Sequence, residues 1–220
     1  MIDLILYDAK WRLRFVYAVR GCVYFFIVSL MLLGFTVSLD QLRTYATGRY
    51  NEYIAVYGEV KLEEIKALKK ELLKIPDWLM DDFISIGGKV VLSSTPMRDV
   101  KKQDKHNDDR YLTLGFFRVN GDTSVEIWVH CSAQAIEGAL LHEFGHYLDR
   151  ARGCVSDSDD FMSVFETEKN RFLEIEKNEY HISSTGEFFA ECFELYLNNP
   201  RRLRKQCPQA FVFMDSLVSA

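Results

Sequence analysis

The stretch Ala139-Leu140-Leu141-His142-Glu143-Phe144-Gly145-His146-Tyr147-Leu148-Asp149 decides how the rest of the chain is interpreted. Its apolar spacing predicts an amphipathic helix, and the helix carries the pattern H-E-x-x-H. Residues four apart lie on one face of a helix, so His142 and His146 can present two imidazoles to one ion, as catalytic zinc sites do. Glu143 lies beside them, placed to take a proton from a water that the metal activates. A surface helix with two solvated histidines can carry the same sequence pattern. Residues further along the chain are therefore needed to distinguish it from a metal site.

The bulk composition is that of a globular protein. The chain has 220 residues, of which 48% are hydrophobic and 27% charged, enough for one domain with a real core. The net charge of −5 argues against a nucleic-acid partner. The five cysteines are irregularly spaced without a C-x-x-C pair, so neither a zinc ribbon nor a disulfide framework is indicated. Small buried thiols are expected. The sequence leaves open whether two of the cysteines form one disulfide bridge.

The first 39 residues differ from the rest in charge. Residues 1–20 hold four basic and two acidic side chains, residues 21–39 hold none, and residues 21–35 are strongly apolar. This length fits either a secretory signal peptide or a membrane anchor. With the basic end inside, the bulk of the chain would lie outside the membrane. We therefore expect a signal peptide or anchor at 1–39 and a secreted or cell-surface domain at 40–220.

Several segments have a clear periodicity. We expect residues 111–119 to form a strand or lid, and residues 40–58 to form a linker or a first helix. Strand 124–130 should be the edge strand beside the cleft, because it alternates and leads almost directly into the H-E-x-x-H helix. The remaining predicted elements are a strand at 89–93 and helices at 61–73, 77–86, 132–152, 161–177 and 184–196.

A third metal ligand is expected downstream, because a catalytic zinc takes three protein ligands and keeps one position open. The predicted helix that begins near Ser184 carries Glu187 and Glu191 four residues apart, so both carboxylates point from one face. On so apolar a helix an acidic pair needs a cationic partner, which zinc would supply. Ser184 and Glu187 also form a capping-box pattern, which explains this glutamate without a metal.

Two motifs together resemble a known family. The segments His142-Glu143-Phe144-Gly145-His146 and Glu187-Phe188-Phe189-Ala190-Glu191, with Tyr180 seven residues before the second, are similar to the catalytic domain of anthrax lethal factor and to the Pro-Pro endopeptidases, its small secreted relatives. Residues 208–213 resemble the C-terminal aromatic helix of that family. The resemblance implies a helix-rich α/β (α+β) metallopeptidase domain of the zincin type, with a small mixed sheet beside the H-E-x-x-H helix.

The same resemblance implies a role for each matching residue. One zinc ion would be held by His142, His146 and Glu187. Glu143 would be the general base that activates water and then passes the proton to the leaving amine. Tyr180 would donate a hydrogen bond to the oxyanion of the tetrahedral intermediate. Glu191 would orient one ligand histidine through its ring N–H.

The expected function is that of an exported zinc endopeptidase acting on a peptide or protein, with proline-containing sites among the bonds to test. Gly186 stands where the Pro-Pro endopeptidases carry a larger residue, and residues 111–129 lack their Gly- and Trp-rich segment, so cleavage between two prolines does not follow. A toxin-like effector protease with one host target, or an anchored zinc-fold domain that only binds, are the alternatives. We expect a monomer, without a nucleic-acid partner and with membrane contact only through an uncleaved N-terminus.

Overall fold

The computed structural model describes residues 52–101, 114–120 and 124–219. The chain divides into two compact units, Met1–Arg49 and Tyr50–Ala220, and all described residues belong to the second. The predicted signal peptide or anchor at 1–39 lies outside the described residues. Among the described helices, none combines the length and the apolar character that a membrane span requires.

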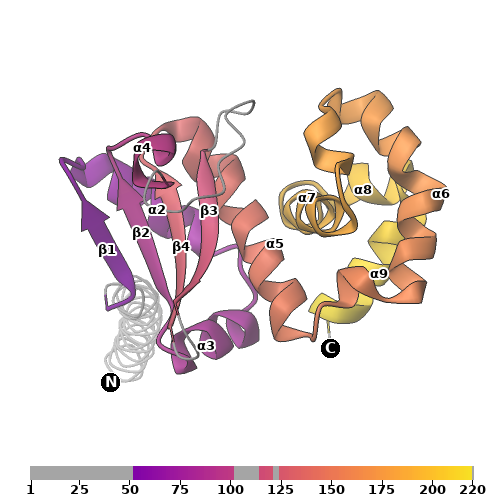
Figure 1. Cartoon of the computed structure of the whole chain (residues 1–220), viewed down its shortest axis with the longest axis horizontal. Helices are drawn as coiled ribbons and strands as arrows, with labels where there is room; N and C mark the ends of the chain where they lie inside the picture. The colour runs from indigo at the N-terminus through magenta and orange to yellow at the C-terminus, as the bar shows by residue number, and fades with distance from the viewer. Residues whose placement is uncertain (1–51, 102–113, 121–123, 220) are drawn as a thin grey trace, which may run out of the picture. The chain divides into compact units, whose positions relative to one another are not determined.

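A four-stranded mixed sheet forms one layer of the fold (Figure 1). Its strands, in spatial order, are β1 (Ile54–Tyr57), β2 (Lys89–Ser93), β4 (Ser124–His130) and β3 (Gly115–Asn120). β1 and β4 both run parallel to β2, whereas β3 is antiparallel to β4. The predicted fold class, a helix-rich domain with a small mixed sheet, is confirmed.

Two predictions about the sheet were wrong. The segment expected to be a linker or a first helix contains the strand β1, which pairs with β2 from Ile54↔Val90 to Tyr57↔Ser93. β4 is an interior strand, and the edge strand is β3. Alternation along a segment shows that one face of a strand is buried, but it does not show which strands lie on either side. The order of the strands depends on backbone pairing between segments that are far apart in the sequence.

Helices cover one face of this sheet. α2 (Leu62–Leu72) and α3 (Asp77–Ser85) pack there with α5 (Leu140–Ala151), and a short helix α4 (Met97–Lys101) contacts β4. Phe83 of α3 packs its ring 5.0 Å, centroid to centroid, from the rings of both Phe144 and Tyr147. These contacts hold α5 against the sheet layer.

The α5 helix is preceded by a π-helical segment, η1 (Ala135–Ala139), which continues directly into it. Ser132 begins this run, since its carbonyl accepts the N–H of Ile136. Gly153 follows the last turn with φ +84°, a conformation that glycine adopts without strain. The predicted extent of the helix, 132–152, therefore holds, but one internal segment is wound more loosely than an α-helix.

The C-terminal helices form a second group, with α5 between them and the sheet (Figure 1). Phe161, Phe188, Phe189 and Phe213 pack their rings together at its centre. The buried carboxylate of Glu168 accepts the backbone N–H groups at the start of the last helix. The elements are η2 (Val155–Asp157), α6 (Asp159–Glu176), η3 (Glu179–Ile182), α7 (Thr185–Asn198), α8 (Pro200–Gln206) and α9 (Pro208–Val218).

The cysteines of the described part are all free. Cys192 and Cys207 are buried, as expected for small thiols in a core, while Cys131 is half-buried and Cys154 is exposed.

Candidate metal centre

The α5 helix presents His142, Glu143 and His146 together because its other faces are apolar. Leu140, Leu141, Phe144 and Leu148 are fully buried on either side of it. Only one stripe of the helix is therefore left for polar groups. His142 and Glu143 are themselves 8% and 7% exposed, so this stripe faces an enclosed site rather than open solvent. The surface-helix interpretation of the motif is therefore wrong.

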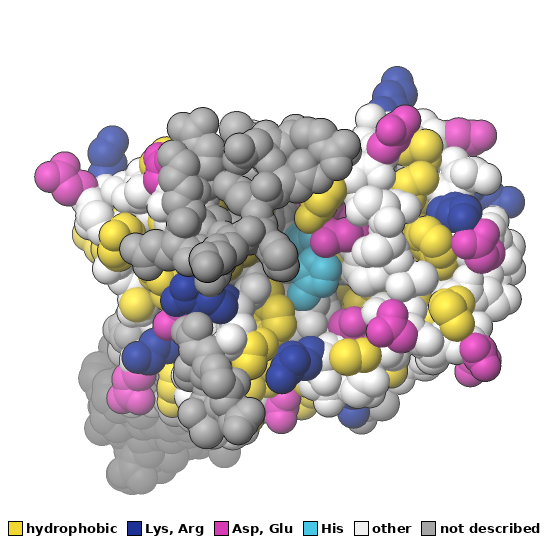
Figure 2. Space-filling model, viewed as in Figure 1, with side chains coloured by type: hydrophobic (Ala, Val, Ile, Leu, Met, Phe, Trp, Pro, Cys, Tyr) yellow, Lys and Arg dark blue, Asp and Glu magenta, His cyan; other side chains and the backbone are white. Residues whose placement is uncertain are grey.

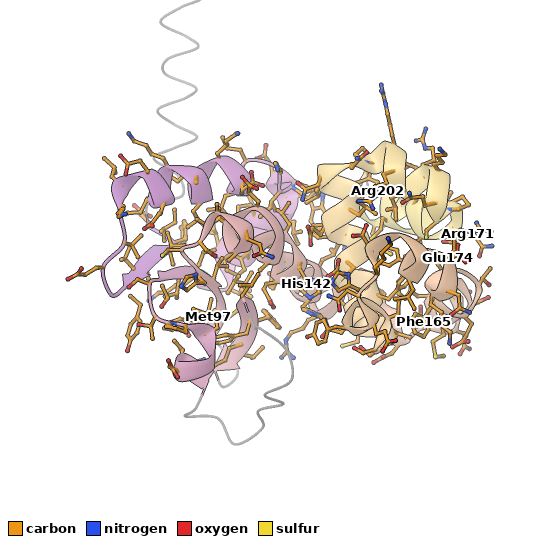
Figure 3. The ribbon with its side chains drawn as sticks, turned by 90° about the horizontal axis from the view of Figure 1, so that it is seen from above. Met97, His142, Phe165, Arg171, Glu174 and Arg202 are labelled. Carbon is orange, nitrogen blue, oxygen red and sulfur yellow. The ribbon has the colours of Figure 1, made fainter. Side chains whose placement is uncertain are left out.

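Glu187 comes from the first turn of α7, which crosses α5. The Ser184 hydroxyl accepts the N–H of Glu187 at 3.1 Å and caps the helix. The side chain of Glu187 points at the two histidines. Its backbone thus takes part in the helix cap while its side chain joins the two histidines. Seen from above (Figure 3), His142 lies between the sheet layer and the C-terminal helices.

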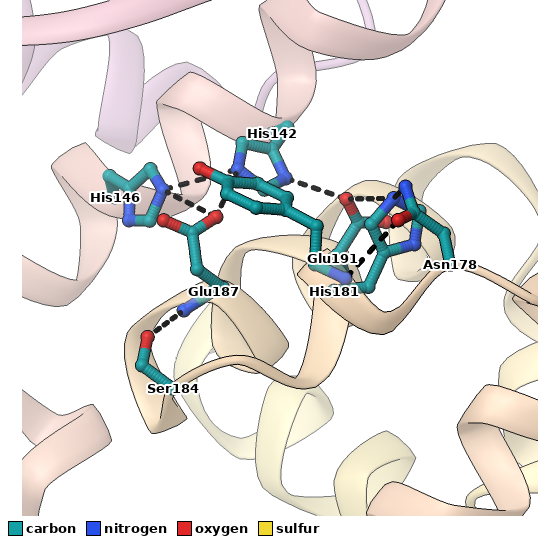
Figure 4. Close-up of polar contacts among 8 residues, drawn as sticks. His142, His146, Asn178, His181, Ser184, Glu187 and Glu191 are labelled. Carbon is teal, nitrogen blue, oxygen red and sulfur yellow. Dashed lines mark hydrogen bonds and ion pairs between the residues drawn. The ribbon is translucent and has the colours of Figure 1, made fainter. Parts of the chain in front are cut away.

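The three side chains converge on one point (Figure 4). The Nε2 atom of His142 lies 3.1 Å from the Nε2 of His146 and 3.1 Å from the Oε2 of Glu187. The remaining edge, from His146 Nε2 to Glu187 Oε2, is 3.6 Å. Ligand atoms about 2.0–2.1 Å from a tetrahedral zinc ion are about 3.3 Å apart, so the observed triangle has the size that zinc requires. The donor set, two imidazoles and one carboxylate, fits this metal.

The electrostatics of the triangle also favour a cation. Burial would raise the pKa of Glu187, but hydrogen bonds with His142 and His146 outweigh it and hold this pKa far below its ordinary range. Burial would lower the pKa of His142, but contacts with Glu187 and Glu191 outweigh it and raise this pKa well above 6.5. The carboxylates around His142 thus stabilise positive charge at the point where a metal would sit.

Glu191 lies behind His142, one turn further along α7. Its Oε1 accepts a hydrogen bond from the Nδ1 of His142 at 2.9 Å. A proton on Nδ1 leaves the Nε2 lone pair directed at the other two ligand atoms. His142 also forms a second cluster, with Glu191 and Glu194. Burial and the neighbouring Glu191 raise the pKa of Glu194 to about 7, so its carboxyl is a weaker anionic ligand than Glu187.

Tyr180 reaches the site from η3. The backbone N–H of Tyr180 donates to the Oδ1 of Asn178, which caps η3. The next residue, His181, has its Nε2 2.7 Å from the Asn178 amide and 3.3 Å from the Oε1 of Glu191, so η3 is tied to α7. Burial, with the Glu187 carboxylate, raises the pKa of Tyr180, so its hydroxyl stays protonated and can donate.

A cavity of about 330 Å³ opens beside these groups. Figure 2 shows histidine side chains in the hollow between the sheet layer and the C-terminal helices. Two stretches of its wall were not foreseen. One is the β3 edge, and the other is the last turn of α5 together with Cys154 in the loop that follows it. The cavity is lined by Gly115, Phe116, Phe117, Glu143, His146, Arg150, Cys154, Tyr180 and Glu187.

All six predicted site residues meet in this region: His142, Glu143, His146, Tyr180, Glu187 and Glu191. Of the residues that sequence reasoning missed, Arg150 could have been found from spacing, because it repeats the four-residue interval of the two histidines. Gly115 could not, because its place at the cavity depends on the order of the strands. A Cβ on Gly115 would lie 3.2 Å from the Cγ of Glu143, so β3 passes close over this side chain.

Two comparisons place the chain among known proteins, and a third found no match. The family model of the anthrax toxin lethal factor, N- and C-terminal domain, matches residues 49–217. Among solved structures, the Pro-Pro endopeptidase PPEP-2 from Paenibacillus alvei has a similar fold, with a TM-score of 0.59, 22% sequence identity, and coverage of 76% of this chain and 98% of that one. A search of curated proteins gave no significant match. The chain therefore belongs to the family of the anthrax toxin lethal factor, N- and C-terminal domain.

Proposed function

We propose that the protein is a zinc-dependent endopeptidase that hydrolyses internal bonds of a peptide or protein. The observation that carries the proposal is the triangle of ligand atoms on His142, His146 and Glu187, with Glu143 and Tyr180 lining the adjoining cavity. The lethal factor family and the PPEP-2-like fold support a peptidase. Zinc, when bound by the three ligands, supplies a Lewis acid beside the scissile carbonyl and makes hydroxide available near neutral pH.

The residues of the chain carry the proton transfers. Glu143 accepts a proton from the attacking water and delivers it to the leaving amine, which makes it the general base and then the general acid. The protonated hydroxyl of Tyr180 donates a hydrogen bond to the oxyanion that develops on the scissile carbonyl. Glu191 holds His142 in the tautomer and orientation that ligation needs.

The β3 edge offers a binding site for an extended substrate. The N–H of His130 donates to the carbonyl of Leu114, which fixes the alternation of bonded pairs along β3 and β4. By that alternation the backbone groups of Gly115 and Phe117 point away from β4, toward the outer edge. A substrate backbone that adds a strand there would be held alongside the metal centre.

Export forms part of the proposal. The basic residues at the start of the chain and the uncharged segment at 21–39 support delivery of the domain to the outside of the membrane. A peptide or protein in that compartment would be the substrate. Peptide hydrolysis needs no further cofactor than the one zinc ion.

The test uses the full chain in mild detergent, loaded with zinc and incubated with a diverse peptide library. New peptide termini are identified by mass spectrometry, which also reads whether proline flanks the cut bond. Glu143→Ala should abolish cleavage, while Glu174→Ala, at an exposed position of α6, should cut like the unaltered protein. Absence of cleavage by the zinc-loaded protein would refute the proposal and favour a domain that only binds.

A further inference from the structure

Arg150 lies on the same face of α5 as the two histidines. It follows His146 by four residues, as His146 follows His142, and it lines the cavity beside the metal centre. Arg150 is an exposed residue. Neither the metal site nor the proton transfers described above make use of this guanidinium.

Within the described part of the chain, Arg150 has no ion-pair partner, and the acid next to it in sequence is engaged elsewhere. The adjacent Asp149 accepts hydrogen bonds from the N–H and the hydroxyl of Ser156, both at 2.7 Å. Arg152, by contrast, stacks over the ring of Trp78 at 4.5 Å from its centroid. Arg150, which lines the cavity, therefore has no counter-ion among the residues that the structure describes.

The charge balance of the cavity leaves Arg150 unmatched. A dication at the triangle would be offset by the carboxylates of Glu187 and Glu143, the two acids among the lining residues. Arg150 is the one Lys or Arg among those described lining residues, so it is the cationic side chain at this end of the cleft. A guanidinium pairs best with a carboxylate, which it binds through two parallel hydrogen bonds.

Helix geometry limits which substrate residue can meet Arg150. Four residues of α-helix advance about 6 Å along the axis, from His146 to Arg150. An extended peptide covers about 3.3 Å per residue, so this interval corresponds to about two substrate residues. We infer that Arg150 selects substrates with a carboxylate within about three residues of the cut bond. The inference rests on the proposed endopeptidase function and specifies its substrate class.

That carboxylate has two sources, an Asp or Glu side chain or the free C-terminus of a short peptide. The test therefore uses two zinc-dependent digestions with the full chain, one of a degenerate decapeptide library with blocked ends and one of the same library with free C-termini. Enrichment of Asp or Glu at one position near the cut in the blocked library identifies a side chain. Cuts confined to the ends of the free-acid peptides identify the C-terminus.

Arg150→Glu and Arg152→Glu form a matched pair, because they change the net charge equally at the same end of α5. The Arg150→Glu protein should lose about tenfold or more in kcat/KM toward acidic peptides and gain a preference for Lys or Arg, as loss of a charged hydrogen bond predicts. Arg152→Glu should keep the original preference, and Arg150→Lys should keep part of it. Arg150→Gln serves if the charge reversal fails to fold. The preference should weaken as salt is raised.

Cleavage without enrichment of a carboxylate, or enrichment that survives Arg150→Glu, would overturn the inference and leave the endopeptidase intact. Absence of all cleavage would count against the proposed function instead. Binding then decides: zinc-loaded Glu143→Gln protein is titrated with fluorescent decapeptides that differ only by Glu or Gln at each position. Tighter binding of the Glu peptides that Arg150→Glu abolishes supports carboxylate recognition, and equal binding overturns it.

Discussion

Gly145 lies directly against Ala190 where α5 crosses α7: a Cβ on the glycine would be 2.7 Å from the Cα of Ala190 and 3.0 Å from its carbonyl oxygen. Real Cβ atoms do not approach backbone so closely, so the two helices can meet at this distance only if α5 carries glycine at position 145. The crossing brings Glu187, three residues before Ala190, to the histidines on either side of Gly145. The glycine is thus a condition for the metal site.

Replacement of this glycine should separate the two helices. We expect Gly145→Ala to lower the free energy of unfolding by about 1–3 kcal/mol, the usual cost of overpacking, although alanine favours helix. Zinc affinity should fall as well, because Glu187 moves away from the histidines. Thermal unfolding and a chelator competition for zinc measure the two effects.

Gly186→Ala is the matched control, since a Cβ there would meet nothing nearer than 3.8 Å. It should leave zinc affinity unchanged and stability unchanged or slightly higher. Equal zinc affinity of the Gly145→Ala protein and the unaltered protein would contradict the role assigned to the close crossing.

Glu191 should contribute to zinc affinity without touching the metal. Loss of its charge in Glu191→Gln weakens the hydrogen bond to His142 Nδ1, and such changes typically cost 10- to 100-fold in metal affinity or activity, so we expect about tenfold for this conservative change. Chelator competition measures the dissociation constant. Glu174→Gln, at an exposed position of α6, should have no effect; an equal loss in both variants would show a general charge effect instead.

Tyr180→Phe should separate catalysis from metal binding. Removal of one oxyanion donor lowers kcat by about 100- to 1000-fold, while zinc affinity and KM stay close to those of the unaltered protein. Steady-state kinetics on a peptide found in the library test, with zinc content measured in parallel, give both values. Loss of zinc from the Phe variant would assign the hydroxyl a structural role instead.

The sequence predicted the parts of the site that depend on local geometry. His142 and His146 lie on one helical face because four residues are close to one turn, and Ser184 caps the helix that carries Glu187. The family resemblance singled out Tyr180, which stands in a short 3₁₀ segment without periodicity of its own. The structure places all of them together.

Long-range pairing explains what the sequence could not predict. β1 is a short strand whose Val56 and Tyr57 are about half exposed, so its residues lack the alternation that marks a half-buried strand. β4 alternates between buried and half-buried residues whereas β3 does not, and only their place relative to β2 decides which one is the edge strand at the cavity. Gly145 occupies one of the variable positions of H-E-x-x-H, and only its contact with Ala190 in the structure shows that glycine is needed there.

The metal-free and zinc-bound proteins should respond to pH in opposite ways. The raised pKa of His142 means that the folded state binds this proton more tightly than the unfolded chain, so its stabilisation is present below pH 6.5 and is lost as pH rises through the raised pKa. The lowered pKa of Glu187 adds stabilisation above pH 4.5, which is lost as pH falls through its folded-state pKa. The chelated protein should therefore unfold at a higher temperature at about pH 6 than at about pH 9.

Zinc reverses this order, because its ligands must be deprotonated to bind. The rise in Tm on adding zinc should be small at about pH 6 and larger at about pH 9, as measured by circular dichroism with a chelator or with zinc at each pH. His142→Gln removes both the histidine proton and one ligand, so it should remove the increment from zinc and most of the pH dependence of the chelated protein. A zinc increment that shrinks as pH rises, or that persists in His142→Gln, would show that the metal is held by other residues.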